Sequence, residues 1–359
     1  MSKTLSVVIP VYNGEKFIQK TLDCIKNQSF QDFELILIND GSIDNTATIL
    51  EDYKKNHNNT MIIHQKNTGQ GNARNVGIKE ATGKYLLLLD ADDLYEKNFF
   101  LSMFENAKKT NADITICKSD NFFSKTGLKC LSDINENKFF PAQSVFFAFD
   151  MSNYIFNFSE GWAWDKLYKT EFVKKNSLFF PDLPHSEDLV FVYGAYCYNP
   201  KIAIVDETLV HHRMRNNSVS TSREKNPLAF IDATKMLKDI MIKTDTFEIY
   251  KQSFVNWIHV FFKWHYETVN NKVVVSKGIK NYLKSEKLLK IPRKYFYNKE
   301  IFEDSKLIYL KKFSFSLIPF SRCCGRYKFF GITVIKTKKK DGKLKIYLCG
   351  IHCLSIKVS

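Results

Sequence analysis

The sequence predicts an α/β protein with a Rossmann-like, mostly parallel sheet flanked by helices. Short apolar runs, rich in β-branched residues, recur along the first 117 residues. Between them lie segments whose apolar residues recur at helical spacing. Strands that alternate with helices form βαβ units, and such units build parallel sheets. Because the runs are almost wholly apolar, we expect the sheet to be covered on both faces.

The strands are expected at Leu5–Ile9, Phe33–Ile38, Met61–His64, Tyr85–Leu89 and Ile114–Cys117. The helices are expected at Lys16–Asn27, Asp44–Lys55, Gly71–Ala81 and Phe99–Lys109. Pro10 is expected to end the first strand, since proline lacks the N–H that a sheet requires. Residues 120–220 are rich in aromatics and show no regular period, so no element is assigned there.

From about residue 223 to residue 290 the pattern is helical, and aromatic residues recur at steps of three and four. In the tail, the stretch Lys328–Lys336 resembles Tyr347–Lys357. Asp341-Gly342 lies between them in a lysine-rich segment and is a hairpin turn signal. We therefore expect a C-terminal β-hairpin with a basic tip.

Charge divides the chain near residue 218. Residues 1–218 hold 24 Lys+Arg and 27 Asp+Glu, a net of −3, whereas residues 219–359 hold 29 and 11, a net of +18. We place a domain boundary there, with domains at 1–220 and 221–359. The basic part implies an anionic partner: nucleic acid, an anionic membrane surface or an anionic glycan. No helix-turn-helix, zinc-finger or RNP-type signature is present, which argues against nucleic acid.

Composition excludes several other classes. Apolar residues make up 44% and charged residues 25% of the 359 positions, which excludes a disordered or collagen-like chain. The longest aliphatic run, at Tyr85–Leu89, is too short to span a bilayer, and Met1–Ile9 lacks the features of a secretory signal. The eight cysteines show no metal-ligand spacing. We expect reduced thiols in a cytoplasmic protein.

Acidic residues mark the carboxyl ends of two predicted strands. Asp90-Ala91-Asp92-Asp93 follows one buried strand and Asp40 follows another. Ligands of parallel α/β sheets bind beyond this edge. Carboxylate oxygens suit Mg²⁺ or Mn²⁺, which would take further ligands from a diphosphate and water. The pattern favours a metal and nucleotide site, with an acidic turn that caps the next helix as the alternative.

Two further motifs admit alternatives. Gly69–Gly77 could be a dinucleotide-binding fingerprint, but Arg74 occupies the third small position, where the helix must pack closely on the strand. Arginine at a helix N-terminus instead suits phosphate or base recognition. Ser186-Glu187-Asp188 could simply begin a helix. It is a candidate general base only because the preceding domain has the features of a sugar-nucleotide site.

Over residues 4–220 the chain resembles the family 2 glycosyltransferases, which are inverting enzymes with the GT-A fold. The matching stretches, in family-like order and spacing, are Val7–Asn13, Leu37–Ser42, Asp44–Thr46, Gly71–Gly77, Gly83–Asp93, Trp164–Tyr168, Glu187-Asp188 and Arg213–Ser220. The basic tail is similar to extensions seen on some members that build bacterial surface polysaccharides or lipooligosaccharides. The resemblance implies a nucleotide-sugar-binding half at 1–117 and an acceptor half at 118–220.

The resemblance also implies residue roles. Pro10, Tyr12 and Asp40 would hold the base of a UDP-sugar, Arg74 would lie on the nucleotide, and Asp90 would sit by the ribose. Asp92 would bind Mn²⁺ or Mg²⁺, and Asp188 would be the catalytic base. Candidates for acceptor or phosphate contacts are Trp164, Glu187, His211 and Arg213. One of His211 and His212, which stand where many members have tyrosines, could ligate the metal; a packed or surface pair is the alternative.

Together these features predict a metal-dependent transferase that moves a sugar from a UDP-sugar to a lipid-linked or oligosaccharide acceptor. Clustered lysines and interleaved aromatics suit an anionic bilayer. We therefore expect a cytoplasmic protein that is peripheral on the inner face of the cytoplasmic membrane. A nucleotide-sugar-binding or glycan-binding module without catalysis is the alternative.

Overall fold

The structure is a computed structural model of the chain. It describes residues 3–123, 129–131, 139–214, 223–288, 292–297 and 301, and the segments 321–323, 326–329, 332–340, 343–348 and 351–357. The chain forms two compact units, Met1–Tyr309 and Leu310–Ser359.

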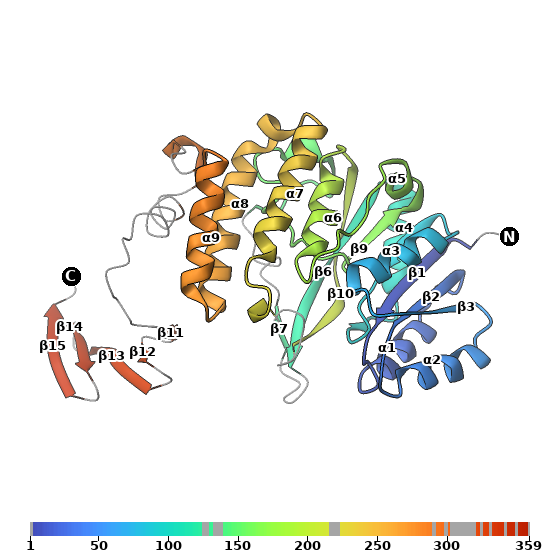
Figure 1. Cartoon of the computed structure of the whole chain (residues 1–359), viewed down its shortest axis with the longest axis horizontal. Coiled ribbons are helices and arrows are strands. Elements are labelled where there is room, and N and C mark those ends of the chain that lie inside the picture. The colour runs from blue at the N-terminus through green and yellow to red at the C-terminus, as the bar shows by residue number, and fades with distance from the viewer. Residues whose placement is uncertain are drawn as a thin grey trace. The chain divides into compact units, whose positions relative to one another are not determined.

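The first unit is built on one large sheet (Figure 1). Its strands follow the order β3 (Thr60–Gln65), β2 (Phe33–Asp40), β1 (Leu5–Val11), β4 (Tyr85–Leu88), β9 (Lys166–Lys169), β6 (Ile114–Phe123), β10 (Lys201–Met214) and β5 (Leu94–Tyr95). β7 (Lys129–Leu131) pairs with β6, and β8 (Val145–Phe147) pairs with β10. All the main strands except β9 and β5 point the same way, so the mostly parallel sheet is confirmed.

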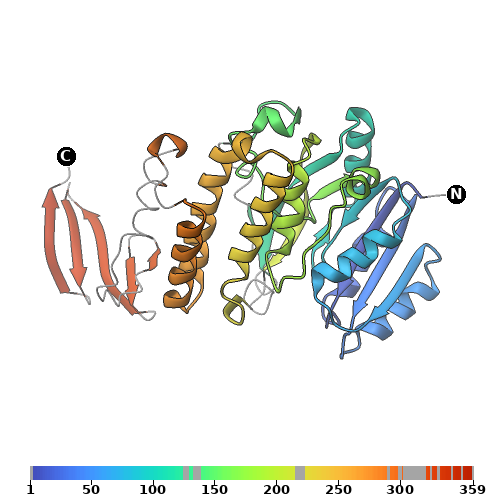
Figure 2. The same ribbon diagram turned by 45° about the horizontal axis from the view of Figure 1, so that its top comes forward.

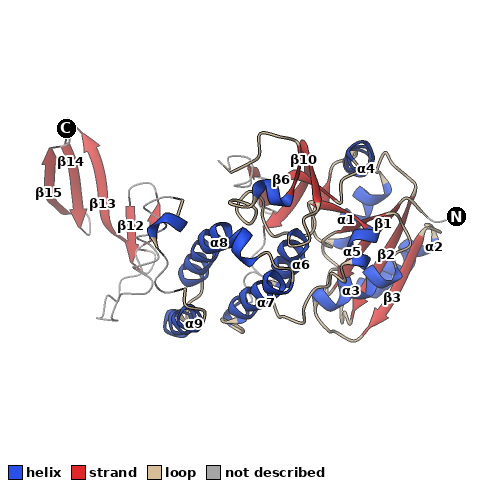
Figure 3. Cartoon of the chain, turned by 90° about the horizontal axis from the view of Figure 1, so that it is seen from above, coloured by secondary structure: helices blue, strands red, loops and turns tan. Residues whose placement is uncertain are grey.

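Helices cover both faces of this sheet, as the apolar strands predicted (Figure 3). On one face pack α1 (Ile18–Lys26), α2 (Thr46–Lys55) and α4 (Phe99–Thr110). On the other pack α3 (Gln70–Glu80), α5 (Thr170–Lys175) and α6 (Glu187–Tyr196). In β1, Val7 and Ile9 face the first set of helices while Val8 faces the second. This alternation follows from the two-residue period of a strand.

Two positions show how closely the backbone is packed. A Cβ at Gly77 would lie 2.2 Å from Val8 Cγ1, so α3 approaches the sheet there as only glycine allows. Pro10 does not end β1 as expected, because the strand continues to Val11 and Pro10 pairs with Ile38 of β2. The pairing of β1 with β4 stops at Val8, so no ladder hydrogen bond to β4 is lost at the proline.

β9 lies in the aromatic-rich region, where the sequence pattern predicted no element. It lies between β4 and β6 and is antiparallel to both. Its four residues are too short a run to show a period. The sheet therefore consists of two parallel blocks joined by one reversed strand.

Three further helices belong to the same compact unit: α7 (Ala229–Lys243), α8 (Phe247–Thr268) and α9 (Lys272–Ser285) (Figure 2). α7 packs on α6, and the core continues through Phe230, Phe254 and Phe262. The two compact units therefore divide near Tyr309. The domain boundary expected at residue 220 rests on the change in net charge, and it stays a prediction about how function is divided along the chain. Within the described residues, none of the helices has the length and apolar character needed to cross a bilayer.

The second unit holds an antiparallel sheet of β11 (Ser321–Cys323), β12 (Arg326–Phe329), β13 (Ile332–Lys340), β14 (Lys343–Leu348) and β15 (Ile351–Lys357). β13 and β14 form the central hairpin, with Lys340 opposite Lys343 and Lys336 opposite Tyr347. The expected turn at Asp341-Gly342 lies outside the described residues. The internal resemblance in the tail therefore reflects a meander of hairpins rather than a single hairpin.

Candidate active site

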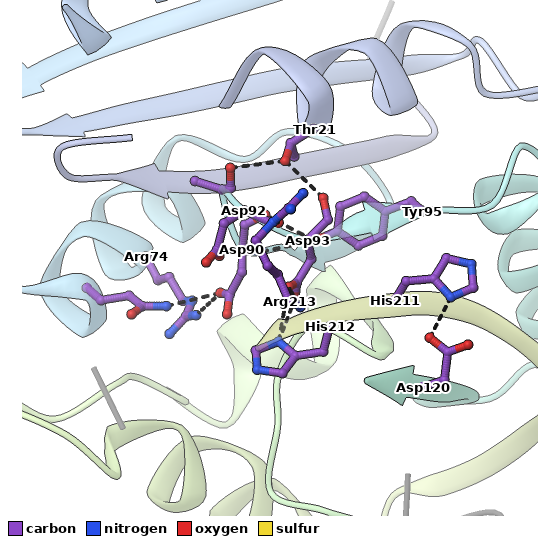
Figure 4. Close-up of polar contacts among 12 residues, drawn as sticks. Thr21, Arg74, Asp90, Asp92, Asp93, Tyr95, Asp120, His211, His212 and Arg213 are labelled. Carbon is purple, nitrogen blue, oxygen red and sulfur yellow. Dashed lines mark hydrogen bonds and ion pairs between the residues drawn. The ribbon is translucent and has the colours of Figure 1, made fainter. Parts of the chain in front are cut away.

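The candidate site lies at the carboxyl edge of the parallel strands, where β4 ends and Asp90–Asp93 begins (Figure 4). The turn is held by Thr21 of α1, whose hydroxyl donates to the carbonyl oxygens of Ala91 at 3.0 Å and Asp93 at 2.9 Å. Tyr95 Oη accepts from the Asp90 N–H at 3.1 Å and donates to its carbonyl at 3.2 Å. The backbone of the acidic turn is thereby fixed before any ligand arrives.

Arg74 of α3 joins two acidic segments that are about 100 residues apart in sequence. Its Nη2 lies 2.5 Å from Asp90 Oδ1 and its Nη1 lies 3.4 Å from Glu187 Oε1. The side chain is buried, and Phe180 lies 5.1 Å from the guanidinium carbon. Gln70 of α3 also donates to Asp90, at 3.0 Å. The arginine that spoils a dinucleotide fingerprint therefore neutralises a buried cluster of carboxylates.

α6 begins with Glu187 and Asp188, as the structure confirms, and both carboxyl groups have perturbed pKa values. Burial raises the pKa of Asp188 to about 8, with a further contribution from the negative charge of Glu187, while Arg74 lowers it. Burial also raises the pKa of Glu187, against the pull of Arg74. A carboxyl group whose pKa lies near neutrality has the property that general acid–base catalysis requires.

A group that could hold a cation is formed by Asp90, Asp93 and His212, whose oxygen and nitrogen atoms lie within 4.8 Å of one another. His212 Nδ1 lies 3.0 Å from Asp93 Oδ1. Burial lowers the pKa of His212, but Asp93 outweighs burial and the pKa is raised to about 9. The surroundings therefore favour positive charge, and the carboxylate oxygens of Asp90 and Asp93 suit Mn²⁺ or Mg²⁺. Asp92, the expected metal ligand, is not one of the three.

The two adjacent histidines of β10 face opposite ways (Figure 4). His211 lies with Nδ1 2.6 Å from Asp120 Oδ1 and Nε2 2.8 Å from Glu96 Oε1. It therefore takes part in a separate polar cluster, while His212 faces the acidic turn. Arg213 donates from its backbone N–H to Asp93 Oδ1 at 2.9 Å and from Nε to the Asp92 carbonyl at 2.6 Å. Arg213 thus fixes the acidic turn from the β10 side.

An aromatic stack adjoins His212. The Trp164 ring lies 5.2 Å from the imidazole at an interplanar angle of 7°, and Trp162 lies 6.3 Å beyond Trp164 at 10°. Trp164 is buried and Trp162 is partly exposed. Trp164 is therefore in place to hold the plane of the His212 ring.

The expected base-binding residues lie around β1 and β2. Asp40 is buried, and its Oδ1 accepts from the Thr68 N–H at 2.9 Å while Oδ2 accepts from the Gly69 N–H at 2.9 Å. These bonds set the start of α3, which carries Arg74. Pro10 is buried within β1, and Tyr12 is exposed just beyond it.

Sequence reasoning assigned no role to Asp93 or Gln70, and it did not choose between His211 and His212. The alternation of side chains along β10 would have separated the histidines, had the strand been recognised. Asp93 was part of the acidic motif, but only the chain path beyond β4 shows that it faces His212.

The chain is similar to known glycosyltransferases. Residues 6–177 match the model of the family described as Glycosyl transferase family 2. The chain is 31% identical over 229 residues to the uncharacterized glycosyltransferase EpsJ of Bacillus subtilis, covering 61% of this chain and 64% of that protein. It is 28% identical over 229 residues to the glycosyltransferase GlyG of Streptococcus pneumoniae, covering 61% and 73%.

A third relative is the poly(ribitol-phosphate) beta-N-acetylglucosaminyltransferase TarS of Staphylococcus aureus, 25% identical over 251 residues, covering 68% of this chain and 42% of that protein. The crystal structure of TarS residues 1–349 in complex with UDP-GlcNAc matches with a TM-score of 0.69 at 19% identity, over 97% of each chain. This likeness shows a shared GT-A fold. Residues 6–177 therefore match the family 2 glycosyltransferases, and the relatives support a glycosyltransferase enzyme.

Proposed function

We propose that this glycosyltransferase moves a sugar from a UDP-sugar to a hydroxyl group of a lipid-linked glycan or oligosaccharide in the assembly of a bacterial surface polysaccharide. The observation that carries the proposal is the bridge formed by Arg74. By pairing with Asp90 and Glu187, it brings the edge of the nucleotide-binding sheet beside Asp188. A diphosphate bound at Asp90 and a base at Asp188 would therefore lie close together. The UDP-GlcNAc complex of TarS supports UDP as the nucleotide.

Asp188 acts as the general base. The carboxylate takes the proton of the acceptor hydroxyl as that oxygen bonds to the anomeric carbon, and the bond from carbon to the diphosphate oxygen breaks with its electron pair. A sugar hydroxyl is a poor nucleophile unless a base accepts its proton as it attacks. Attack opposite the departing diphosphate inverts the anomeric centre. The raised pKa of Asp188 makes its carboxylate a stronger base than an ordinary aspartate.

Asp90, Asp93 and His212 would hold the divalent ion, Mn²⁺ or Mg²⁺. Such an ion supplies Lewis-acid stabilisation of the diphosphate as negative charge develops on it. Arg213 and Thr21 keep the turn in a shape that can receive the ion, through contacts to the turn rather than to the substrate. The expected role of Asp92 as a metal ligand stays a prediction, since the side chains that converge are its neighbours.

The nucleotide end of the site is assigned by the family resemblance. Pro10, Tyr12 and Asp40 would border the uracil, and Asp90 would lie near the ribose. The buried Asp40 also anchors the segment before α3, so it would act partly by positioning the backbone of Thr68 and Gly69. Trp164, Glu187, His211 and Arg213 remain candidates for acceptor or phosphate contacts; for Glu187 and Arg213 the contacts above support a positioning role.

We further propose that the basic residues beyond 220 hold the enzyme on the inner face of the cytoplasmic membrane, where a lipid-linked acceptor would lie. Residues 219–359 carry a net charge of +18. On α8 and α9, Val260 and Val273 are exposed by 51% and 65%, so apolar groups accompany the lysines. Lysines near anionic lipid each contribute about 1 kcal/mol to binding. Cosedimentation with phosphatidylglycerol vesicles, but not with phosphatidylcholine vesicles, tests this.

The central experiment is calorimetric titration of UDP, UDP-Glc, UDP-Gal and UDP-GlcNAc, with and without Mn²⁺. We expect UDP to bind only with Mn²⁺ present, and the sugar that binds tightest to be the donor. Asp188→Asn should abolish transfer and leave UDP binding unchanged, because the base contacts the acceptor. Near wild-type transfer by that variant would show that the base lies elsewhere. Absence of UDP binding under both conditions would exclude a UDP-sugar donor.

A further inference from the structure

The segment before β9 places an aromatic side chain at the edge of the candidate site. Trp162 is 37% exposed, whereas its neighbour in the stack, Trp164, is 5% exposed. One tryptophan is therefore covered by protein and the other presents part of its ring to solvent. A partly open indole offers an apolar face together with an N–H donor, a combination that suits contact with a ligand.

The stack extends outward from the cation group. His212 faces Asp93, and the Trp164 ring lies 5.2 Å from the imidazole at an interplanar angle of 7°. The Trp162 ring lies 6.3 Å from the Trp164 ring at 10°. The three rings are nearly parallel, so the plane of Trp162 is set by the same contacts that set His212. An indole with a fixed plane loses little entropy when a flat ligand face packs on it.

A buried ion pair fixes the backbone beneath Trp162. Lys166 and Asp165 are both fully buried, and Lys166 Nζ lies 2.6 Å from Asp165 Oδ1. The same ammonium donates to the carbonyl oxygens of Trp162 at 2.8 Å and Glu160 at 3.0 Å. These bonds use all three N–H groups of the ammonium. Burial of a charged lysine costs free energy, and here its N–H groups bond to oxygen atoms of the segment that carries Trp162.

The same segment packs against the start of α6, where Asp188 lies. A Cβ at Gly161 would lie 2.2 Å from Leu189 Cδ2, so the backbone next to Trp162 touches the residue that follows Asp188. Trp162 is thus tied to the base on one side and, through Trp164, to His212 on the other. The reacting acceptor hydroxyl must approach from the side of the base.

We infer that Trp162 forms the platform of an acceptor subsite, on which one pyranose ring of the acceptor stacks with its C–H face against the indole. The inference rests on the proposed function, since it takes Asp188 as the base. The sugar ring would be held with a hydroxyl directed toward Asp188, while its polar edges stay open to water. Trp162 is a binding and specificity residue in this scheme and takes no part in proton transfer.

The test uses the full chain, with UDP and Mn²⁺ and again without them. Saturation-transfer NMR is measured with methyl β-D-glucopyranoside, methyl β-D-galactopyranoside and methyl N-acetyl-β-D-glucosaminide. We expect the wild type to saturate the C–H protons of one sugar face. Trp162→Ala should weaken binding about tenfold, as loss of an aromatic contact of this size implies. Trp162→Phe, which keeps a flat ring, should give an intermediate value.

Phe147→Ala is the matched control. Phe147 is 48% exposed but pairs with Lys201 at the amino end of β10, whereas His212 lies near the carboxyl end. This variant should bind the glycosides as the wild type does. All three variants should show the UDP affinity and far-UV circular dichroism of the wild type.

The outcomes separate the two proposals. Unchanged glycoside binding by Trp162→Ala, or no binding of the three glycosides by the wild type, would overturn the acceptor platform. Loss of UDP affinity in Trp162→Ala would overturn it too, by placing the indole on the donor. Failure of the wild type to bind UDP would instead contradict the UDP-sugar donor. The measurements of glycoside binding without nucleotide would still test the role of Trp162.

Discussion

The stability of Asp188→Asn relative to the wild type should increase as the pH rises, and the same substitution should abolish transfer. In the folded chain burial holds the pKa of Asp188 at about 8. In the unfolded chain an aspartate ionises near pH 4. Between these values the folded state binds one more proton than the unfolded state. The wild type therefore loses stability as the pH rises through this range, and asparagine, which does not ionise, removes the loss.

The magnitude follows from one proton. Each pH unit between the two pKa values changes the free energy of unfolding by about 1.4 kcal/mol, so the advantage of Asp188→Asn grows by about 2.7 kcal/mol from pH 5 to pH 7. The compact unit that contains Asp188 spans Met1–Tyr309. A unit of that length has an unfolding entropy of about 0.6 kcal/mol/K, so the difference in Tm should widen by about 4 °C.

Differential scanning fluorimetry of both proteins at pH 5, 6 and 7 measures this difference. Asp182→Asn is the matched control, because Asp182 is an exposed carboxylate in the same segment. Its Tm difference from the wild type should not vary with pH. A difference for Asp188→Asn that stays constant or narrows from pH 5 to pH 7 would refute the claim that the folded protein keeps this carboxyl group protonated.

Four other substitutions test further parts of the molecule. Glu187→Gln should shift the acidic limb of the pH profile of kcat/KM to lower pH by about one unit, because the charge of Glu187 raises the pKa of Asp188; a shift to higher pH would contradict this. His212→Ala should raise the Mn²⁺ concentration for half-maximal activity at least about tenfold, whereas His211→Ala should leave it unchanged; equal effects would argue against the proposed ligand set. Gly77→Ala should lower the free energy of unfolding by about 1–3 kcal/mol in urea titration, because its Cβ has no space against β1, and an unchanged midpoint would show that α3 can move away.

The first 117 residues could be predicted well because their strands are short apolar runs between clear helical periods. The starts of β2 and β4, at Phe33 and Tyr85, agree with the expected residues, and so does the acidic turn after β4. Such strands are buried on both faces, so composition alone identifies them. β9 and β10 could not be found in this way. β9 has four residues, and β10 contains charged residues that face separate polar clusters.

Side-chain direction set the limit on predicting the site. The sequence identified Arg74, Asp90, Glu187 and Asp188, and the structure joins all four through short contacts or adjacency. It did not show that His212 rather than His211 faces the acidic turn. Adjacent residues on a strand point to opposite faces, and which face is which depends on partners 90 to 120 residues away.

The reversed strand β9 also has a consequence for the newly made chain. Until residues 166–169 leave the ribosome, β4 and β6 have no partner on the sides that they turn toward each other. About 40 residues separate the end of β6 at Phe123 from the start of β9 at Lys166, which at about 5–20 residues per second is about 2–8 seconds of synthesis. Two open strand edges exist during that time, and open edges invite pairing with other chains. Slowed translation in this stretch should therefore favour aggregation more than the same delay after residue 214, when β10 is also available to pair with β6.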